Sequence, residues 1–354
     1  MAEKTTGAFS IGGVQVQPGE RRIIELPVTD LSTSTPVSMP VQVICGKRPG
    51  PTLLICAAIH GDEISGVEII RRVLSLSSLR RLHGTLVAVP VVNAFGFMSQ
   101  SRYLPDRRDL NRSFPGSPQG SLASRIAHLF LNEIVAKCSH GIDLHTGAIH
   151  RGNYPQVRAN LDDADASSMA MNFGVPVVIN ASLRSGSLRE AAKTHGVPLI
   201  VYEAGEALRF DEMSIRAGVK GIMRVMRGLG MLHLGRSMGK SFEPIIARST
   251  TWLRAPASGI LRASAGLGAQ VREGGRLAYI ANAFGGDEVE VKSPWNGIVI
   301  GRTNLPLVYE GDALFHIARL EGTQVVAETL DAFSPEEAYA EGLTAELADD
   351  PLIA

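Results

Sequence analysis

Leu53-Leu54-Ile55-Cys56-Ala57-Ala58-Ile59, followed directly by His60-Gly61-Asp62-Glu63, is the stretch that decides the fold. After it, Val67, Ile70 and Val73 recur at helical spacing and predict a helix with one apolar face. In α/β proteins, ligands and metals bind where a buried strand ends in a short loop before a helix. The stretch therefore predicts an α/β sheet with a polar site at the end of this strand.

Length and composition limit what the chain can be. At 354 residues it exceeds a typical single core, which favours two domains. The net charge of zero and the pI of about 7.1 give no general attraction to nucleic acid or anionic membranes, and base-stacking aromatic residues make up only 5%. No apolar run reaches the ~18 residues of a membrane span. We expect neither nucleic acid nor a membrane as a partner.

The three cysteines, Cys45, Cys56 and Cys138, are odd in number and lack CxxC spacing. This pattern argues against a disulfide framework and against a thiolate zinc site, and it fits a reducing cytosol. The N-terminus also lacks the basic and apolar segments that are typical of a signal peptide. The expected location is the cytoplasm.

The character of the chain changes along its length. Residues 10–45 alternate between apolar and polar and predict a few antiparallel strands. From about 51 to 235, strand-like runs alternate with helical segments, which is typical of an α/β sheet with helices on both faces. The predicted strands are 53–59, 85–92, 175–180 and 198–203, and the predicted helices are 64–76, 120–137, 187–195 and 212–229.

After Arg248 the chain turns to short strands and glycines that contain an internal repeat. Ala255-Pro256-Ala257-Ser258-Gly259-Ile260 is echoed 38 residues later by Ser293-Pro294-Trp295-Asn296-Gly297-Ile298. Two such copies resemble the paired half-motifs of lipoyl and biotinyl carrier domains, which form a small β barrel-sandwich. The lysine that carriers modify would fall at Gly286, eight residues before Pro294. We therefore predict a structural domain, or a lid beside the site, rather than a carrier.

These changes predict three segments. A catalytic domain covers residues 1–248, a smaller all-β domain covers 249–320, and a tail covers 321–354. The tail contains nine Asp or Glu and no Lys or Arg. It predicts a solvated, partly helical segment without a catalytic role.

His60-Gly61-Asp62-Glu63 by itself is only a weak indication of a metal site. Several further motifs follow it in order along the chain. They are Arg102-Tyr103, Pro105-Asp106, Asp109-Leu110-Asn111-Arg112-Ser113-Phe114-Pro115-Gly116, Asp143-Leu144-His145-Thr146-Gly147 and Val201-Tyr202-Glu203-Ala204-Gly205. In this order, over roughly residues 50–320, they resemble the succinylglutamate desuccinylase/aspartoacylase family, a branch of the zinc carboxypeptidase-like hydrolases. The resemblance implies a zinc-carboxypeptidase-like three-layer α/β/α domain, with a smaller all-β barrel-sandwich-like domain at the C-terminal end.

By this resemblance, His60, Glu63 and His145 are the expected ligands of one zinc ion per chain. Two imidazoles and a carboxylate leave an open position and a net charge near +1, which lowers the pKa of bound water toward ~7. Asp143 lies two residues before His145 on one strand, so both side chains point to one face. Asp143 either accepts the second N–H of His145 and holds the ring, or is an ordinary polar residue at a strand end.

Glu203 matches the catalytic glutamate of the family. It ends the apolar run Pro198-Leu199-Ile200-Val201, where a carboxylate is expected to be paired or functional. The resemblance implies a general base toward water and then a general acid toward the leaving amine. Glu206 is the weaker candidate for this role, and a helix N-terminal carboxylate is the structural alternative for Glu203.

Four arginines and an asparagine are the candidates for substrate contacts. Asn111 and Arg112 match family residues, and a guanidinium fork suits the carboxylate of an N-acyl amino acid. Arg102 matches the family arginine that polarises the scissile carbonyl. Its spacing of nine residues before Asn111 is slightly longer than the family pattern. Either Arg189, which we prefer, or Arg184 matches the arginine that precedes the catalytic glutamate.

Three further positions bear on the substrate. His150 lies close enough to the His145 loop to be a contact. Tyr309 is near, but not at, the position of a substrate-binding tyrosine in aspartoacylases, and Asn93 is followed by Ala94 where the family often has proline. These departures weaken an assignment to N-acetylaspartate or succinylglutamate.

The expected function is zinc-dependent hydrolysis of the amide bond of an N-acyl amino acid, with zinc-activated water as the nucleophile and Glu203 as the general base. The expected partner is that small-molecule substrate, and a homo-oligomer is compatible with the sequence. One alternative is a metallocarboxypeptidase that acts on a peptide or a peptidoglycan fragment. An alternative of another class is a non-catalytic, metal-bound binding protein.

Overall fold

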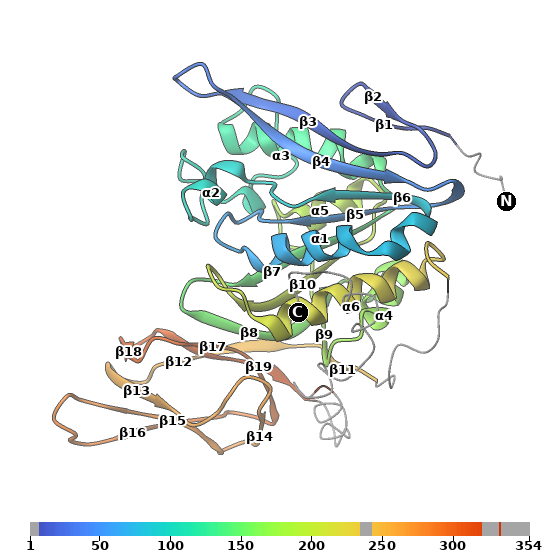
Figure 1. Ribbon diagram of the computed structural model, residues 1–354. Coiled ribbons are helices and arrows are strands. Elements are labelled where there is room, and N and C mark those ends of the chain that lie inside the picture. Colours follow the sequence, from blue (N-terminus) through green and yellow to red (C-terminus); the bar gives the residue numbers. More distant parts are fainter. Residues whose placement is uncertain (1–6, 234–242, 321–332, 334–354) are drawn as a thin grey trace.

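The computed structural model describes residues 7–233, 243–320 and 333 (Figure 1). The predicted acidic tail, 321–354, lies outside the described residues except for Phe333, whose ring centroid is 6.1 Å from that of Tyr154. None of the described helices is long and apolar enough to cross a lipid bilayer.

Ten strands precede the last long helix. They are β1 (Phe9–Ile11), β2 (Val14–Val16), β3 (Arg21–Asp30), β4 (Pro36–Cys45), β5 (Arg48–Ala57), β6 (His83–Val89), β7 (His140–Gly147), β8 (Arg151–Ala159), β9 (Val177–Asn180) and β10 (Leu199–Glu206). β1 and β2 form a separate antiparallel ribbon, and β3 pairs antiparallel with β4. The strands predicted for residues 10–45 are therefore confirmed.

The helices alternate with these strands. They are α1 (Ser65–Ser75), α2 (Ala94–Met98), α3 (Leu122–Glu133), α4 (Ala164–Phe173), α5 (Leu188–Thr194) and α6 (Glu212–Gly228), with short 3-10 helices η1 (Ser77–Arg81), η2 (Leu110–Arg112) and η3 (Val135–Lys137). Capping side chains fix where several of the helices begin. In α6, the side chain of Asp211 accepts a hydrogen bond from the Ser214 N–H at 2.7 Å and caps the helix. The four predicted helices are present, with shifted ends, whereas β8 and α4 were not predicted.

Alternation along β5 explains why both faces of the sheet are covered. Leu53, Ile55 and Ala57 join one apolar cluster with residues of α1, α4 and α6. Leu54 and Cys56 join a second cluster with residues of α3 and α5. Successive strand residues point to opposite faces, so an uninterrupted apolar run needs helices on both sides (Figure 1). The result is a mixed α/β fold with a buried central sheet.

The C-terminal strands are β11 (Ile245–Ala247), β12 (Thr250–Arg254), β13 (Gly259–Ala263), β14 (Gln270–Val271), β15 (Arg276–Ala281), β16 (Val289–Lys292), β17 (Gly297–Thr303), β18 (Leu307–Val308) and β19 (Ala313–Arg319). The sequence repeat is visible in them, since β13 and β17 begin at the matching Gly259 and Gly297. Each copy also pairs with the other: β14 lies on β17, and β18 lies on β13. Gly286 lies in the loop between β15 and β16.

In the described residues, the large sheet has thirteen strands, and its main path is β12-β19-β17-β8-β10-β7-β5-β6-β4-β3. β17 pairs antiparallel with β8, with Gly301 opposite Asn153, so hydrogen bonding continues from the central sheet into the C-terminal strands. At the centre, β5, β7 and β10 are parallel neighbours. Their carboxyl ends therefore meet at one edge, beside the C-terminal strands (Figure 1).

Candidate metal centre and active-site cleft

The loop after β5 places two of the predicted ligands. His60 follows the strand and Glu63 precedes α1, so the turn between them must be tight. Gly61 makes this turn possible, because a Cβ at this position would lie 1.9 Å from the backbone carbonyl carbon of Gly96 in α2. The third predicted ligand, His145, lies near the end of β7.

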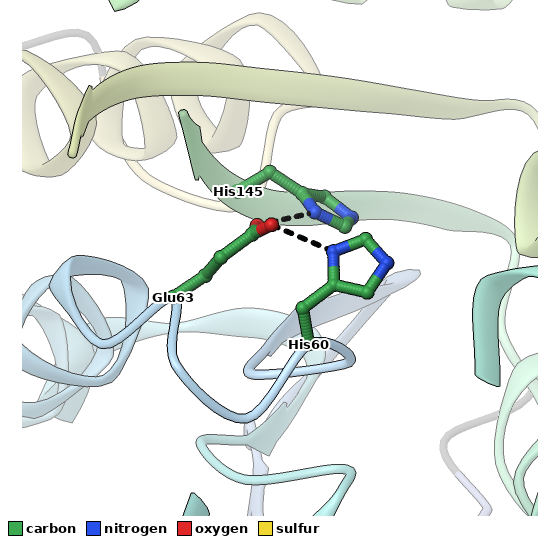
Figure 2. Close-up of side chains that lie close together, drawn as sticks. All are labelled: His60, Glu63 and His145. Atoms are coloured by element: carbon green, nitrogen blue, oxygen red, sulfur yellow. Dashed lines mark hydrogen bonds and ion pairs between the residues drawn. The ribbon is translucent and has the colours of Figure 1, made fainter. Parts of the chain in front are cut away.

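These three side chains converge on one point (Figure 2). His60 Nδ1 lies 2.7 Å from Glu63 Oε1, and His145 Nδ1 lies 2.7 Å from Glu63 Oε2. One ligand atom from each residue lies within 4.8 Å of the other two, and the residues are only 4%, 2% and 7% exposed for His60, Glu63 and His145. The structure thus brings the three predicted ligands together in a buried cluster.

Two further carboxylates hold the imidazoles from behind. Asp143 Oδ2 lies 2.8 Å from His145 Nε2, which matches the positioning role considered for Asp143. Asp109 Oδ1 lies 3.1 Å from His60 Nε2, a partner that was not predicted. Since each Nε2 is engaged, both rings present Nδ1 to the centre of the cluster. Asp109 could have been suspected only from its place beside Asn111 and Arg112.

The charged side chains of the cluster shift one another's pKa. Burial alone would raise the pKa of Glu63, but the two adjacent imidazoles hold it well below its usual range. Burial alone would lower the pKa of His145, but the charges of Asp143 and Glu63 raise it above its usual value. The carboxylate is therefore ionised and attracts positive charge into the space between the rings. A divalent cation there would replace that charge, since a ligating imidazole must be neutral.

The cluster fits a metal ion by its chemistry. Two imidazole nitrogens and a carboxylate are a donor set that binds zinc, and the carboxylates behind the rings are the outer partners that such ligands usually have. The backbone N–H of Thr146 also donates to Glu63 Oε2, at 3.1 Å, and orients that carboxylate. His60, Glu63 and His145 could therefore hold one divalent ion.

Arg102 lies directly beside this cluster. Its guanidinium donates to Glu63 Oε1 at 3.2 Å and to Asp109 Oδ2 at 2.9 Å. The side chain is 28% exposed and lines the cavity described below. Arg102 therefore contacts one predicted ligand, Glu63, and the partner of another, Asp109.

Glu203 lies on β10 directly opposite His145 of β7 in the parallel pairing. Its Oε2 accepts a hydrogen bond from Asn153 Nδ2 at 2.9 Å, and its Oε1 lies 3.0 Å from Arg158 Nε. The rival carboxylate, Glu206, is turned elsewhere, because it accepts hydrogen bonds from the His150 N–H and from Asn304 Nδ2. Only Glu203 of these two glutamates lines the cavity.

A cavity of about 1170 Å³ is lined by the three predicted ligands, by Glu203 and by Arg102. Its lining includes Asn111, Arg112 and both rival arginines, Arg184 and Arg189. Asn111 Oδ1 also accepts a hydrogen bond from the Leu188 N–H at 2.9 Å, which fixes the start of α5. The seven lining arginines are Arg102, Arg112, Arg151, Arg158, Arg184, Arg189 and Arg248.

The C-terminal strands supply one wall of the cavity. Trp252 of β12 and His316 of β19 both line it and stack with ring centroids 4.7 Å apart and an interplanar angle of 7°. Burial, with help from the charge of Arg158, lowers the pKa of His316 to about 3, so this imidazole is neutral at physiological pH. Tyr309 is 76% exposed and is not among the lining residues, and neither is His150. Neither Trp252 nor His316 was predicted as a residue of the site.

Comparison with known proteins identifies the family. The family model of the succinylglutamate desuccinylase/aspartoacylase catalytic domain matches residues 49–229, slightly more than half of the chain. The chain belongs to this family. The matched region runs from β5 to the end of α6 and includes the buried cluster and Glu203.

Relatives match over most of their length. The N-alpha-acetyl-L-2,4-diaminobutyric acid deacetylase of Halomonas elongata is 27% identical over 327 residues, which is 88% of this chain and 93% of the relative. The product-bound ectoine utilization protein of Ruegeria pomeroyi is similar in structure, with a TM-score of 0.75 and 25% identity over 85% of this chain and 95% of that one. A succinylglutamate desuccinylase/aspartoacylase from Rhodobacter sphaeroides shares the fold, with a TM-score of 0.73 and 24% identity over 84% of this chain and 95% of that one.

Proposed function

We propose that this protein is a zinc-dependent hydrolase that removes the acyl group from an N-acyl amino acid or a related small amide. The observation that carries the proposal is the buried group of His60, Glu63 and His145, whose ligand atoms lie within 4.8 Å of one another in the same cavity as Glu203. Membership of a deacylase family and the named activity of the Halomonas elongata relative support it.

The proposed zinc ion is held by three ligands and two carboxylates behind them. His60, Glu63 and His145 would hold one zinc ion per chain, and the bound ion would supply Lewis-acid activation of water and of the scissile carbonyl. Asp109 and Asp143 would keep the two imidazoles in place through the hydrogen bonds already described.

Glu203 carries the protons in the proposed reaction. It takes a proton as the water oxygen bonds to the amide carbon, and it returns that proton to the nitrogen as the carbon–nitrogen bond breaks. Its carboxylate accepts a hydrogen bond from Asn153, and both residues line the cavity. The products are a carboxylate and a free amine.

In this proposal, three arginines contact the substrate and one asparagine positions the wall beside it. Arg102, beside the metal ligands, donates to the carbonyl oxygen as negative charge develops there. Arg112 forms a charge-assisted contact with the carboxylate of the amino acid, and Asn111 fixes the start of α5 next to it. Between the rival arginines, Arg189 is assigned to the substrate.

Other expectations of the sequence stay predictions. They are the carboxypeptidase-like character of the layered domain, the domain limits at 248 and 320, the barrel-sandwich character of the C-terminal strands, the cytoplasmic location and a homo-oligomer. The wall formed by Trp252 and His316 supports a small substrate over a long peptide, because these rings line the cavity from the C-terminal strands.

A hydrolysis screen with the zinc-loaded protein tests the proposal. The panel contains N-acetyl, N-succinyl and N-butyryl amino acids, N-alpha-acetyl-2,4-diaminobutyrate and C-terminal peptide substrates. We expect release of a free amine from N-acyl amino acids and no release from the peptides. Cleavage of peptides alone would establish the carboxypeptidase alternative, and no cleavage of any compound would favour the binding-protein alternative.

A further inference from the structure

Cys56 is a buried residue of β5 that makes a polar contact behind the metal-ligand cluster. Its side chain has no exposed surface, and it stands beside Asp143 in the parallel pairing of β5 with β7. The sulfur lies 3.5 Å from Asp143 Oδ1 and 3.8 Å from the Ile142 carbonyl oxygen. The thiol therefore faces a carboxylate as well as the apolar side chains of the core.

The protonation of this thiol sets the direction of the contact. Burial raises the pKa of the Cys56 thiol well above its usual value, and the charge of Asp143 raises it further. The sulfur is therefore protonated at physiological pH. A thiol is a weak donor, and an ionised carboxylate only accepts, so the hydrogen bond runs from Cys56 to Asp143.

Asp143 depends on this donor, because it is almost completely buried, at 1% exposed. Its Oδ2 lies 2.8 Å from His145 Nε2. Among the residues that the structure describes, the Cys56 thiol is the one hydrogen-bond donor to Oδ1. A buried carboxylate is unfavourable unless both of its oxygens accept hydrogen bonds. Cys56 thus completes the carboxylate that holds His145.

The carboxylate behind the other imidazole, Asp109, is held more strongly. Its Oδ1 accepts a hydrogen bond from the Asn111 N–H at 2.8 Å, and its Oδ2 accepts one from the guanidinium of Arg102 at 2.9 Å. Asp143 has the Cys56 thiol alone in these two roles, within the described part of the chain. Loss of one donor should therefore affect the orientation of Asp143 more than that of Asp109.

We propose that Cys56 is a positioning residue of the metal centre, whose S–H donates to Asp143 Oδ1 and thereby orients His145 toward the metal ion. The pair also joins the two ligand-bearing strands, since His60 and Glu63 follow β5 and His145 lies on β7. The inference rests on the proposed function for the presence of the ion. The hydrogen bond between the two side chains does not depend on that function.

Zinc affinity, measured by competition with a chelator, gives the first test. Cys56→Ala removes the donor, and the affinity should fall about 3- to 10-fold, the size of one hydrogen bond. Cys138→Ala is the matched control, because Cys138 is buried in the same apolar cluster and its thiol donates to the Ile134 carbonyl oxygen at 3.3 Å. It removes the same atom from the core without touching Asp143, and it should retain the wild-type affinity.

Two further variants separate positioning from packing. Cys56→Ser retains a donor in a side chain of similar shape, so its zinc affinity should lie closer to that of the wild type than the affinity of Cys56→Ala does. In an Asp143→Asn background, Cys56→Ala should change the affinity by less than about 2-fold, since the carboxylate on which it acts is gone. Equal losses in the two backgrounds would overturn the proposal, as would equal losses in Cys56→Ala and Cys138→Ala, or none in Cys56→Ala.

Infrared spectroscopy of the metal-free protein tests the hydrogen bond itself, because S–H stretching bands are separate from those of other protein groups. The band that disappears in Cys56→Ser belongs to Cys56. We expect it to move to higher frequency in Asp143→Asn, where the charged acceptor is lost, and to stay in place in Cys138→Ala. A band that does not move in Asp143→Asn would refute the proposal. If the band moves and zinc affinity responds as expected, yet no amide is hydrolysed, the proposed function fails and the role of Cys56 stands.

Discussion

Two groups of residues in the cavity lining are built in opposite ways. In the cluster of His60, Glu63 and His145, every imidazole nitrogen and carboxylate oxygen has a partner within 3.1 Å. In the second group, Arg158 and Arg189 each keep a buried donor that has no hydrogen-bond partner among the residues described. The metal-ligand cluster is fully paired within the protein, whereas the arginine pair retains donors without a partner among the described residues. We infer that the metal-ligand cluster determines the reaction and that the arginines contribute to the choice of substrate.

The largest effect is expected at the metal-ligand cluster. His60→Ala removes a ligand and leaves Glu63 with one imidazole, so zinc content measured by elemental analysis should fall from about one ion per chain to nearly none. Hydrolysis should be lost with it. His195→Ala, a change at an exposed histidine that ends α5, should retain zinc and activity. Full zinc occupancy in His60→Ala would remove His60 from the ligand set.

The next effect separates proton transfer from metal binding. Glu203→Gln keeps the shape of the side chain but cannot accept a proton, so kcat should fall on the order of 10²–10⁴-fold while zinc content is unchanged. Glu206→Gln is the matched control, because Glu206 is outside the cavity lining and bonds to His150 and Asn304. Wild-type turnover in Glu203→Gln would exclude Glu203 as the base.

A smaller effect is expected from the carboxylates behind the imidazoles. Asp143→Asn weakens the partner of His145 Nε2, and zinc affinity should fall about 10- to 100-fold, as is usual for outer partners of ligands. Competition with a chelator measures this change. Asp165→Asn, on the exposed start of α4, should leave affinity unaltered. Equal affinities of Asp143→Asn and the wild type would mean that the second ring nitrogen does not position His145.

The sequence predicted the metal-ligand cluster better than the rest of the cavity lining, and the reason is physical. His60, Glu63 and His145 follow or end apolar strands, and strand ends in α/β sheets meet at one edge. Asp109, by contrast, reaches His60 from a loop 49 residues away, and nothing local indicates that contact. Family resemblance supplied Glu203, Arg112 and Arg189, which the structure then brings to one cavity.

Arg158 was missed because β8 itself was missed. Its sequence, Arg-Gly-Asn-Tyr-Pro-Gln-Val-Arg-Ala, has no apolar alternation and includes a proline. It becomes a buried strand only because β10 and β17 pair with it on both sides. Helix α4 was missed for a related reason, since small residues such as Ala166 and Ala170 form its buried face and give a weak pattern. Trp252 and His316 likewise reach the cavity only through tertiary structure.

The most direct test of the central claim is anomalous scattering at the zinc absorption edge from crystals of the zinc-loaded protein. We predict one strong peak per chain, at about 2.0–2.2 Å from His60 Nδ1, His145 Nδ1 and a carboxylate oxygen of Glu63. A peak held by other residues, or one that any of these three side chains does not contact, would contradict the account.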